Sequence, residues 1–101
     1  MEIIGRKFLD NYRLLDAHDK INKIEVYFEY RGYKNISQRG YYLVAIPYIV
    51  KGKEVKKGKE FKLLIDTDDS FGEILYEWSL EKVNKNKIDY LIGQIREKYL
   101  N

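Results

Sequence analysis

The sequence predicts a single α+β domain in which an antiparallel β-sheet is followed by C-terminal helices packed on one of its faces. Two patterns support this: apolar residues recur with a period of two in the first two thirds of the chain and with a helical period in the last third. The chain has 101 residues, of which 45% are hydrophobic and 35% charged. That length suits one core, and no Pro-, Gly- or Ser-rich tract marks a linker. We therefore expect residues 1–101 to form one domain.

The clearest strand covers residues 24–30, where apolar and polar side chains alternate. One face receives Ile24, Val26, Phe28 and Tyr30, and the other receives Glu25, Tyr27 and Glu29. We expect the first face to be buried and the second to be solvated.

Residues 41–46 are apolar at every position, which is typical of a strand inside a sheet. Pro47 cannot donate a ladder hydrogen bond, so we expect an edge or a bulge around Tyr48. Turns at 51–53 and 57–59 flank a short piece at Val55, and 61–65 forms another strand. Short turns between consecutive strands imply antiparallel pairing.

The N-terminal segment fits two structures. Ile4, Phe8, Tyr12 and Leu15 have the spacing of a helix face, but residues 12–15 could also pair with the 24–30 strand through the polar connection at His18-Asp19-Lys20. We prefer the strand.

The last third of the chain predicts two helices. Ile88, Leu91, Ile92, Ile95 and Tyr99 recur at helical spacing, and Asn86 is the expected N-cap. An earlier helix opens at Ser70, with Glu73 completing a capping box, and loosens near Asn84. Its apolar positions are Ile74, Leu75, Trp78 and Val83.

Composition excludes several chemistries. The absence of cysteine rules out disulfides, thiolate zinc sites and cysteine nucleophiles, and favours a reducing cytoplasm. The first seven residues do not resemble a secretory signal, and no segment is long and apolar enough to span a bilayer. We expect a cytoplasmic protein that does not enter membranes.

The candidates for a catalytic or metal site each fit a structural role better. Residues 66–77 match part of a calcium loop, but Phe71 stands where the loop needs glycine and Glu73 where it needs an apolar residue. Glu25 and Glu29 are explained by a solvated strand face, and His18 by a surface connection. Glycine-rich phosphate-binding motifs are absent. We therefore expect no enzyme, no metal and no cofactor.

Two binding surfaces remain as hypotheses. Tyrosine is abundant, with ten in the chain, and tyrosine and arginine commonly anchor protein interfaces. We expect a surface around Tyr27, Tyr33 and Arg39 to bind an unidentified protein partner. The alternative is weak binding of nucleic acid by a lysine-rich turn region beside exposed tyrosines. Its lysines are Lys51, Lys53, Lys56, Lys57 and Lys59.

The run Arg39-Gly40-Tyr41-Tyr42-Leu43, with Pro47 just beyond it, resembles small uncharacterised proteins carried on conjugative elements and phages of Gram-positive bacteria. The resemblance implies a bacterial mobile-element origin and favours binding of a macromolecule over catalysis. It assigns no functional residue, and it leaves the oligomeric state open.

Overall fold

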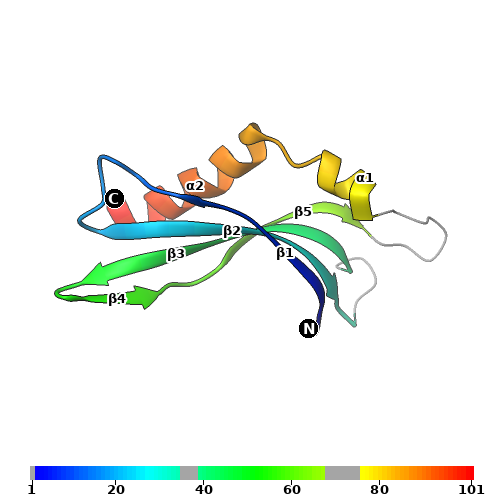
Figure 1. The fold of residues 1–101 in the computed structure, drawn as a ribbon, viewed down its shortest axis with the longest axis horizontal. Helices are drawn as coiled ribbons and strands as arrows, with labels where there is room; N and C mark the ends of the chain where they lie inside the picture. Colours follow the sequence, from blue (N-terminus) through cyan, green and yellow to red (C-terminus); the bar gives the residue numbers. More distant parts are fainter. Residues whose placement is uncertain (1, 35–38, 68–75) are drawn as a thin grey trace.

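A computed structural model describes residues 2–34, 39–67 and 76–101, which form a five-stranded antiparallel sheet with two helices on one face (Figure 1). The expected fold class, an antiparallel sheet followed by C-terminal helix packed against it, is confirmed. No helix in the described ranges is long and apolar enough to cross a membrane. The elements are β1 Glu2–Tyr12, β2 Ile21–Gly32, β3 Gly40–Lys51, β4 Glu54–Lys57, β5 Phe61–Thr67, α1 Tyr76–Glu81 and α2 Lys85–Leu100.

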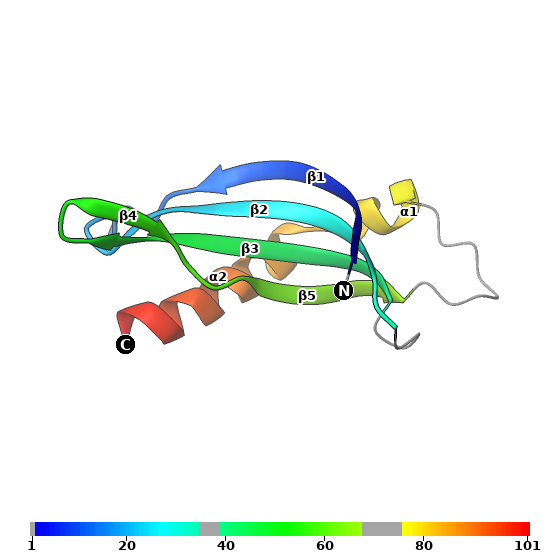
Figure 2. The same ribbon diagram turned by 90° about the horizontal axis from the view of Figure 1, so that it is seen from below.

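Strand β3 is the centre of the sheet (Figure 2). It pairs with β2 along one side, while β5 and β4 share its other side, β5 from Gly40 to Ala45 and β4 from Tyr48 to Lys51. The predicted interior strand at 41–46 is therefore confirmed. Pro47 falls between these two pairing segments, so its missing donor disturbs neither. The predicted bulge is also present, because the β2–β3 register shifts between Ile21 and Lys23, opposite Tyr48.

The N-terminal segment is a strand, as preferred, and pairs with β2 along its length. The expectation that pairing would continue to residue 15 is wrong, because β1 ends at Tyr12. Leu14 and Ala17 turn into the core, where they are 8% and 5% exposed, and the amide of Ala17 donates to the Leu14 carbonyl. Leu15 points to solvent. The apolar side chains thus close the end of the core instead of extending the sheet.

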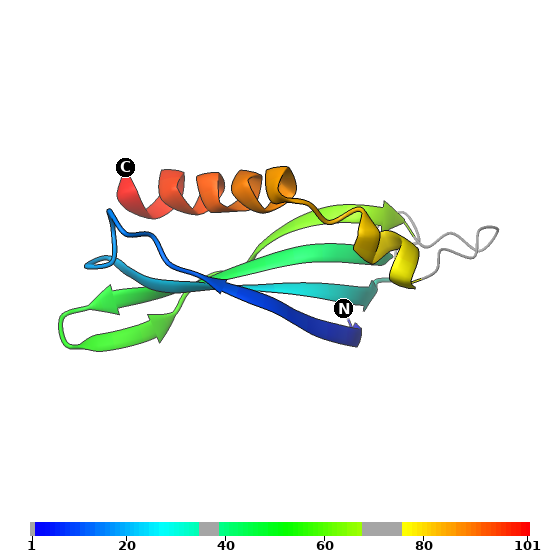
Figure 3. The ribbon, with the colours of Figure 1, turned by 45° about the horizontal axis from the view of Figure 1, so that its top comes forward.

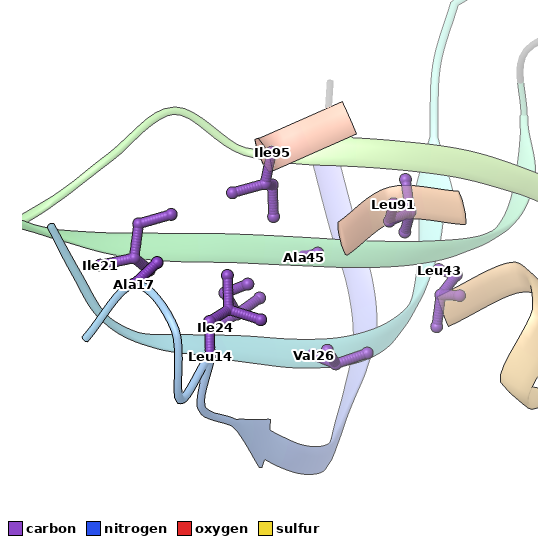
Figure 4. Packing of buried hydrophobic residues seen from close by; sticks show 9 residues of the cluster. All are labelled: Leu14, Ala17, Ile21, Ile24, Val26, Leu43, Ala45, Leu91 and Ile95. Carbon is purple, nitrogen blue, oxygen red and sulfur yellow. The ribbon is translucent and has the colours of Figure 1, made fainter. Parts of the chain in front are cut away.

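The main core lies between the sheet and α2 (Figures 3 and 4). Leu91 and Ile95 of α2 are fully buried, and the other three residues of the predicted stripe pack around them. Burying one such side chain contributes about 1.5–3 kcal/mol. The stripe therefore holds α2 on the sheet. The strand residues beneath it are Ile21, Ile24, Val26, Leu43 and Ala45.

The helices differ from the prediction at two points, one in where α2 begins and one in which residue of α1 is buried. Asn84, not Asn86, is the N-cap of α2: its backbone is extended, and its side chain accepts from the amide of Lys87 at 3.0 Å. Trp78 of α1 is exposed, and Ser79 is the buried residue instead. Ser79 donates to Asp66 at 2.9 Å, so a polar contact anchors this short helix. The proposed capping pair, Ser70 and Glu73, lies outside the described residues.

Two substitutions two residues apart in α2 should shift stability in opposite directions. Leu91→Ala should lower the free energy of unfolding by about 2–5 kcal/mol, because it empties a fully buried site. Gly93→Ala should raise it by about 0.5–1 kcal/mol, because Gly93 is exposed in a helix and an added Cβ meets nothing within 4 Å. Urea denaturation measures both. A Leu91→Ala variant as stable as wild type would show that α2 does not hold the core.

Candidate functional site on the open face of the sheet

The sheet face opposite the helices, seen from below in Figure 2 and here called the open face, carries a second cluster of buried side chains. Tyr42, Val44 and Ile46 of β3 are at most 6% exposed, although no further layer of secondary structure from the described residues covers them. Tyr27, Tyr33 and Tyr48 are half-buried around them. Long side chains from neighbouring strands therefore form the cover of this face.

The expectation that Glu25 and Glu29 mark a solvated face is wrong. Glu29 is fully buried, and Glu25 is half-buried. Next along the same strand, Arg31 is also fully buried. A buried charge is costly unless it is paired and hydrogen-bonded, so this face must supply partners for all three.

Those partners form an ion network that ties three parts of the chain together. Arg31 donates to Glu29 at 2.7 Å and to both carboxylate oxygens of Glu60, at 3.0 and 2.7 Å. Arg6 of β1 donates to the other oxygen of Glu29 at 2.6 Å. The Arg31 hydrogen bond holds the pKa of Glu60 below its usual range. The network fixes β1 and the segment before β5 against β2.

Glu25 binds the hydroxyls of two tyrosines on the same face. Tyr48 donates to it at 2.6 Å and Tyr27 at 3.1 Å. The Tyr48 hydrogen bond, aided by that of Tyr27, lowers the pKa of Glu25 despite its burial. Conversely, the bond to Glu25 raises the pKa of Tyr48 to about 12.

Cations lie over the tyrosine rings. Arg6 is 4.4 Å from the ring centre of Tyr27, and Lys62 is 5.1 Å from that of Tyr33. Arg6 and Lys62 are exposed, whereas the two rings are half-buried. The open face therefore presents positive charge to solvent, supported by aromatic rings beneath it. Lys23 over Tyr48, at 4.8 Å, repeats the arrangement.

Apolar side chains lie at the two edges of this charged centre. Phe8 of β1 pairs with Tyr27 and Leu64 of β5 pairs with Tyr42, so both lie on the open face. Phe8 is 48% exposed and Leu64 is 40% exposed. The open face thus combines exposed apolar edges with a cationic centre.

The structure places two of the three predicted interface residues, Tyr27 and Tyr33, in the open-face cluster. The third, Arg39, is half-buried and donates to the backbone carbonyl of Tyr33 at 3.2 and 3.3 Å. It therefore ties the residue before β3 to the residue after β2. The sequence analysis missed the cations of this face, Arg6 and Lys62. The one available signal was that Glu29 and Arg31 stand two residues apart on one strand, because residues at that spacing share a face of the sheet.

The predicted nucleic-acid lysines all lie on or beside the β3–β4 hairpin and are exposed. Three of them, Lys51, Lys56 and Lys57, line one cavity, whereas Lys53 and Lys59 do not. The expected exposed tyrosines are absent beside them: Tyr48 and Tyr99 are half-buried. Among the described residues only Tyr90, in α2, is an exposed tyrosine.

The other candidate sites show no assembled chemistry. His18 is exposed, and its Nδ1 lies 3.2 Å from the carbonyl of Leu15. Asp66 of the calcium-like segment binds Ser79 and Lys82, and most of that segment lies outside the described residues. In the part of the chain that the structure describes, no group of three or more His, Asp or Glu could hold a metal ion.

Comparison with known proteins gives no match: no family model, no curated protein and no solved structure is similar to this chain. The function is therefore inferred from the chemistry of the open face.

Removing Arg31 should destabilise the fold strongly. Arg31→Met leaves Glu60 without its bidentate partner and takes one of the two cations from buried Glu29, so we expect a loss of about 3–5 kcal/mol. Arg13→Met makes the same chemical change at an exposed site and should alter stability by about 0.5 kcal/mol or less. Chemical denaturation compares the two variants. Equal midpoints would show that the network does not stabilise the fold.

The Tyr48 hydroxyl should resist ionisation. In the native state its pKa is raised to about 12, so it should remain protonated at about pH 11, where an unperturbed tyrosine is mostly ionised. The stability that this bond contributes is complete below about pH 10 and is lost as the pH rises through the native pKa. Carbon-13 NMR of the ring Cζ follows the titration. Glu25→Gln should lower the Tyr48 pKa toward 10, and an unchanged pKa in that variant would contradict the assignment.

Proposed function

We propose that this protein is a non-enzymatic interaction module whose open face binds an acidic segment of a protein partner. One observation carries the proposal: this face exposes the cations of Arg6 and Lys62, while its carboxylates, Glu25, Glu29 and Glu60, are each hydrogen-bonded within the protein. Glu29 is buried between two arginines, and Glu60 is engaged by both ends of the Arg31 guanidinium. The exposed charge of this face is therefore suited to binding anions.

The residue types around that charge favour a protein partner. Tyrosine, phenylalanine and arginine are enriched at protein interfaces, where they bury much area at low entropic cost. Phe8 and Leu64 offer exposed apolar surface at the two edges, and the rings of Tyr27 and Tyr33 lie between them. A segment that alternates acidic and apolar side chains would satisfy both features.

Single-stranded nucleic acid is the less favoured partner for this face. Base stacking needs accessible ring surface, but these rings are half-buried and cations of the protein itself lie over them. The hydroxyls of Tyr27 and Tyr48 are already bound to Glu25. A base would have to displace these contacts.

We propose that this module works in the reducing cytoplasm of a bacterium and is encoded on a mobile element. The cysteine-free composition supports the compartment, and the resemblance at residues 39–43 supports the origin. The proposal assigns no catalytic residue and no cofactor.

Reversing the charge at the centre of the open face should abolish this binding. The probe is a set of synthetic peptides that alternate Asp or Glu with Phe or Leu, titrated into isotope-labelled protein and followed by NMR. We expect salt-sensitive shifts of backbone amides in β2 and β3. Lys62→Glu should weaken binding by about tenfold or more, because it places like charges together. Lys85→Glu makes the same charge change at the start of α2 and should leave the affinity within about twofold.

Thermal melts of both variants must match wild type for this comparison, since Lys62 also donates to the Tyr33 hydroxyl at 3.0 Å. Shifts that map to α2 would overturn the proposal, as would equal affinities of the two variants. Oligothymidylate is the second probe. If it binds the open face more tightly than the acidic peptides do, the nucleic-acid alternative replaces the proposed one.

A further inference from the structure

A cavity of about 390 Å³ lies between the β3–β4 hairpin and the last turn of α2, away from the centre of the open face. Its walls carry three lysines and no carboxylate. The remaining lining combines aliphatic, aromatic and bare backbone surface. The lining residues are Ile49, Lys51, Lys56, Lys57, Gly58 and Tyr99.

The sheet register explains the place of two of the three lysines. Ile49 and Lys56 are direct partners in the β3–β4 pair, so their side chains share the face on which Ile49 contacts the main core. The hairpin turn between the two strands is made by Gly52, at φ 64°, a conformation that L side chains rarely adopt. Lys51 is two residues from Ile49 on the same strand and so shares its face, which places it diagonally across from Lys56.

Gly58 and Tyr99 complete the wall. The Gly58 amide donates to the Pro47 carbonyl at 2.7 Å, and a Cβ at Gly58 would lie 3.0 Å from that carbonyl oxygen. Any other residue at position 58 would therefore require this carbonyl to shift by a few tenths of an ångström. The Tyr99 ring is held edge-on against Phe61, with centroids 6.3 Å apart. The cavity thus has a fixed aromatic side as well as a charged one.

The balance of charge at the cavity is positive. Lys51, Lys56 and Lys57 line it, and the carboxylate of exposed Glu54 lies 3.6 Å from the Lys56 ammonium group. The C-terminal end of α2 adds about half a negative charge. Together these leave more than one net positive charge for a ligand.

We propose that this cavity binds a phosphomonoester of about nucleotide size, with the lysines on the phosphate and with Tyr99 and Ile49 against the organic group. Lysine binds phosphate as a mobile point charge, and a wall that is aromatic and aliphatic favours a ring beside it. The volume lies within the range of small-molecule sites, roughly 300–1,000 Å³. The site is independent of the open face, because Arg6, Lys62 and the tyrosines of that face do not line it.

The test compares three probes by calorimetry or NMR: adenosine monophosphate, adenosine and inorganic phosphate. The monophosphate should bind at least about tenfold more tightly than either of the others, since adenosine lacks the phosphate and inorganic phosphate lacks the organic group. Lys56→Glu should weaken monophosphate binding by about tenfold or more. Lys53→Glu makes the same change on the same hairpin outside the cavity and should stay within about twofold of wild type. Tyr99→Leu should reduce the preference for the monophosphate over inorganic phosphate.

Equal binding of adenosine and its monophosphate would overturn the site, as would equal affinities of Lys56→Glu and Lys53→Glu. Both lysines are exposed, so each variant should melt like wild type. Oligonucleotides with and without a terminal phosphate separate a free nucleotide from a nucleic-acid end: only the phosphorylated one should compete if chain ends are accepted. Lys62→Glu should not affect monophosphate binding, so failure here leaves the proposed function of the open face untouched.

Discussion

The buried guanidinium of Arg31 is the contact on which the open face of this protein depends. It lies near the end of β2 without access to water, and Glu29, Glu60 and the Tyr33 hydroxyl accept hydrogen bonds from it. An arginine in that position is tolerable only because both carboxylates are held in place. Glu29 needs Arg6 in turn, so the ion network joins β1, β2 and the segment before β5. This set of charges holds in place the side chains that cover this side of the sheet.

The two faces of the sheet are therefore stabilised by different physics. On the helix side, Leu91 and Ile95 bury apolar area against strand residues, which excludes water without any directional requirement. On the open side, a small apolar cluster is sealed by hydrogen-bonded tyrosines and paired charges. Directional contacts of this kind fix side-chain positions, and they leave the cations over the rings as the outermost groups. Pre-organised cations on a rigid sheet suit recognition, because little ordering remains to be done on binding.

The two proposed sites use positive charge in different ways. On the open face the cations are spread over several strands and lie above aromatic rings, which suits an extended acidic segment. At the hairpin three lysines converge on one cavity with a single aromatic wall, which suits one compact anion. The β3–β4 hairpin contributes to both regions, since Tyr48 and Lys57 pair within it. The hairpin extends beyond the part of β3 that pairs with β5, and this extension carries the second site.

The sequence by itself determined the strands after residue 20, their antiparallel pairing and the stripe that docks α2, because periodicity and turn residues act over a few neighbouring positions. It left the N-terminal segment open between helix and strand. It could not determine that Glu29 is buried: a carboxylate on an alternating strand indicates solvent unless its partners are known, and Arg6 lies 23 residues away. Trp78 was expected on the apolar face of its helix but is exposed, and its buried neighbour Ser79 donates to Asp66, which lies 13 residues away. The lysines were visible as a group, but only the tertiary structure selects three of them by placing Tyr99 beside the hairpin. Local pattern fixes the elements, whereas burial of charge and the shape of a cavity depend on contacts between residues far apart in the chain.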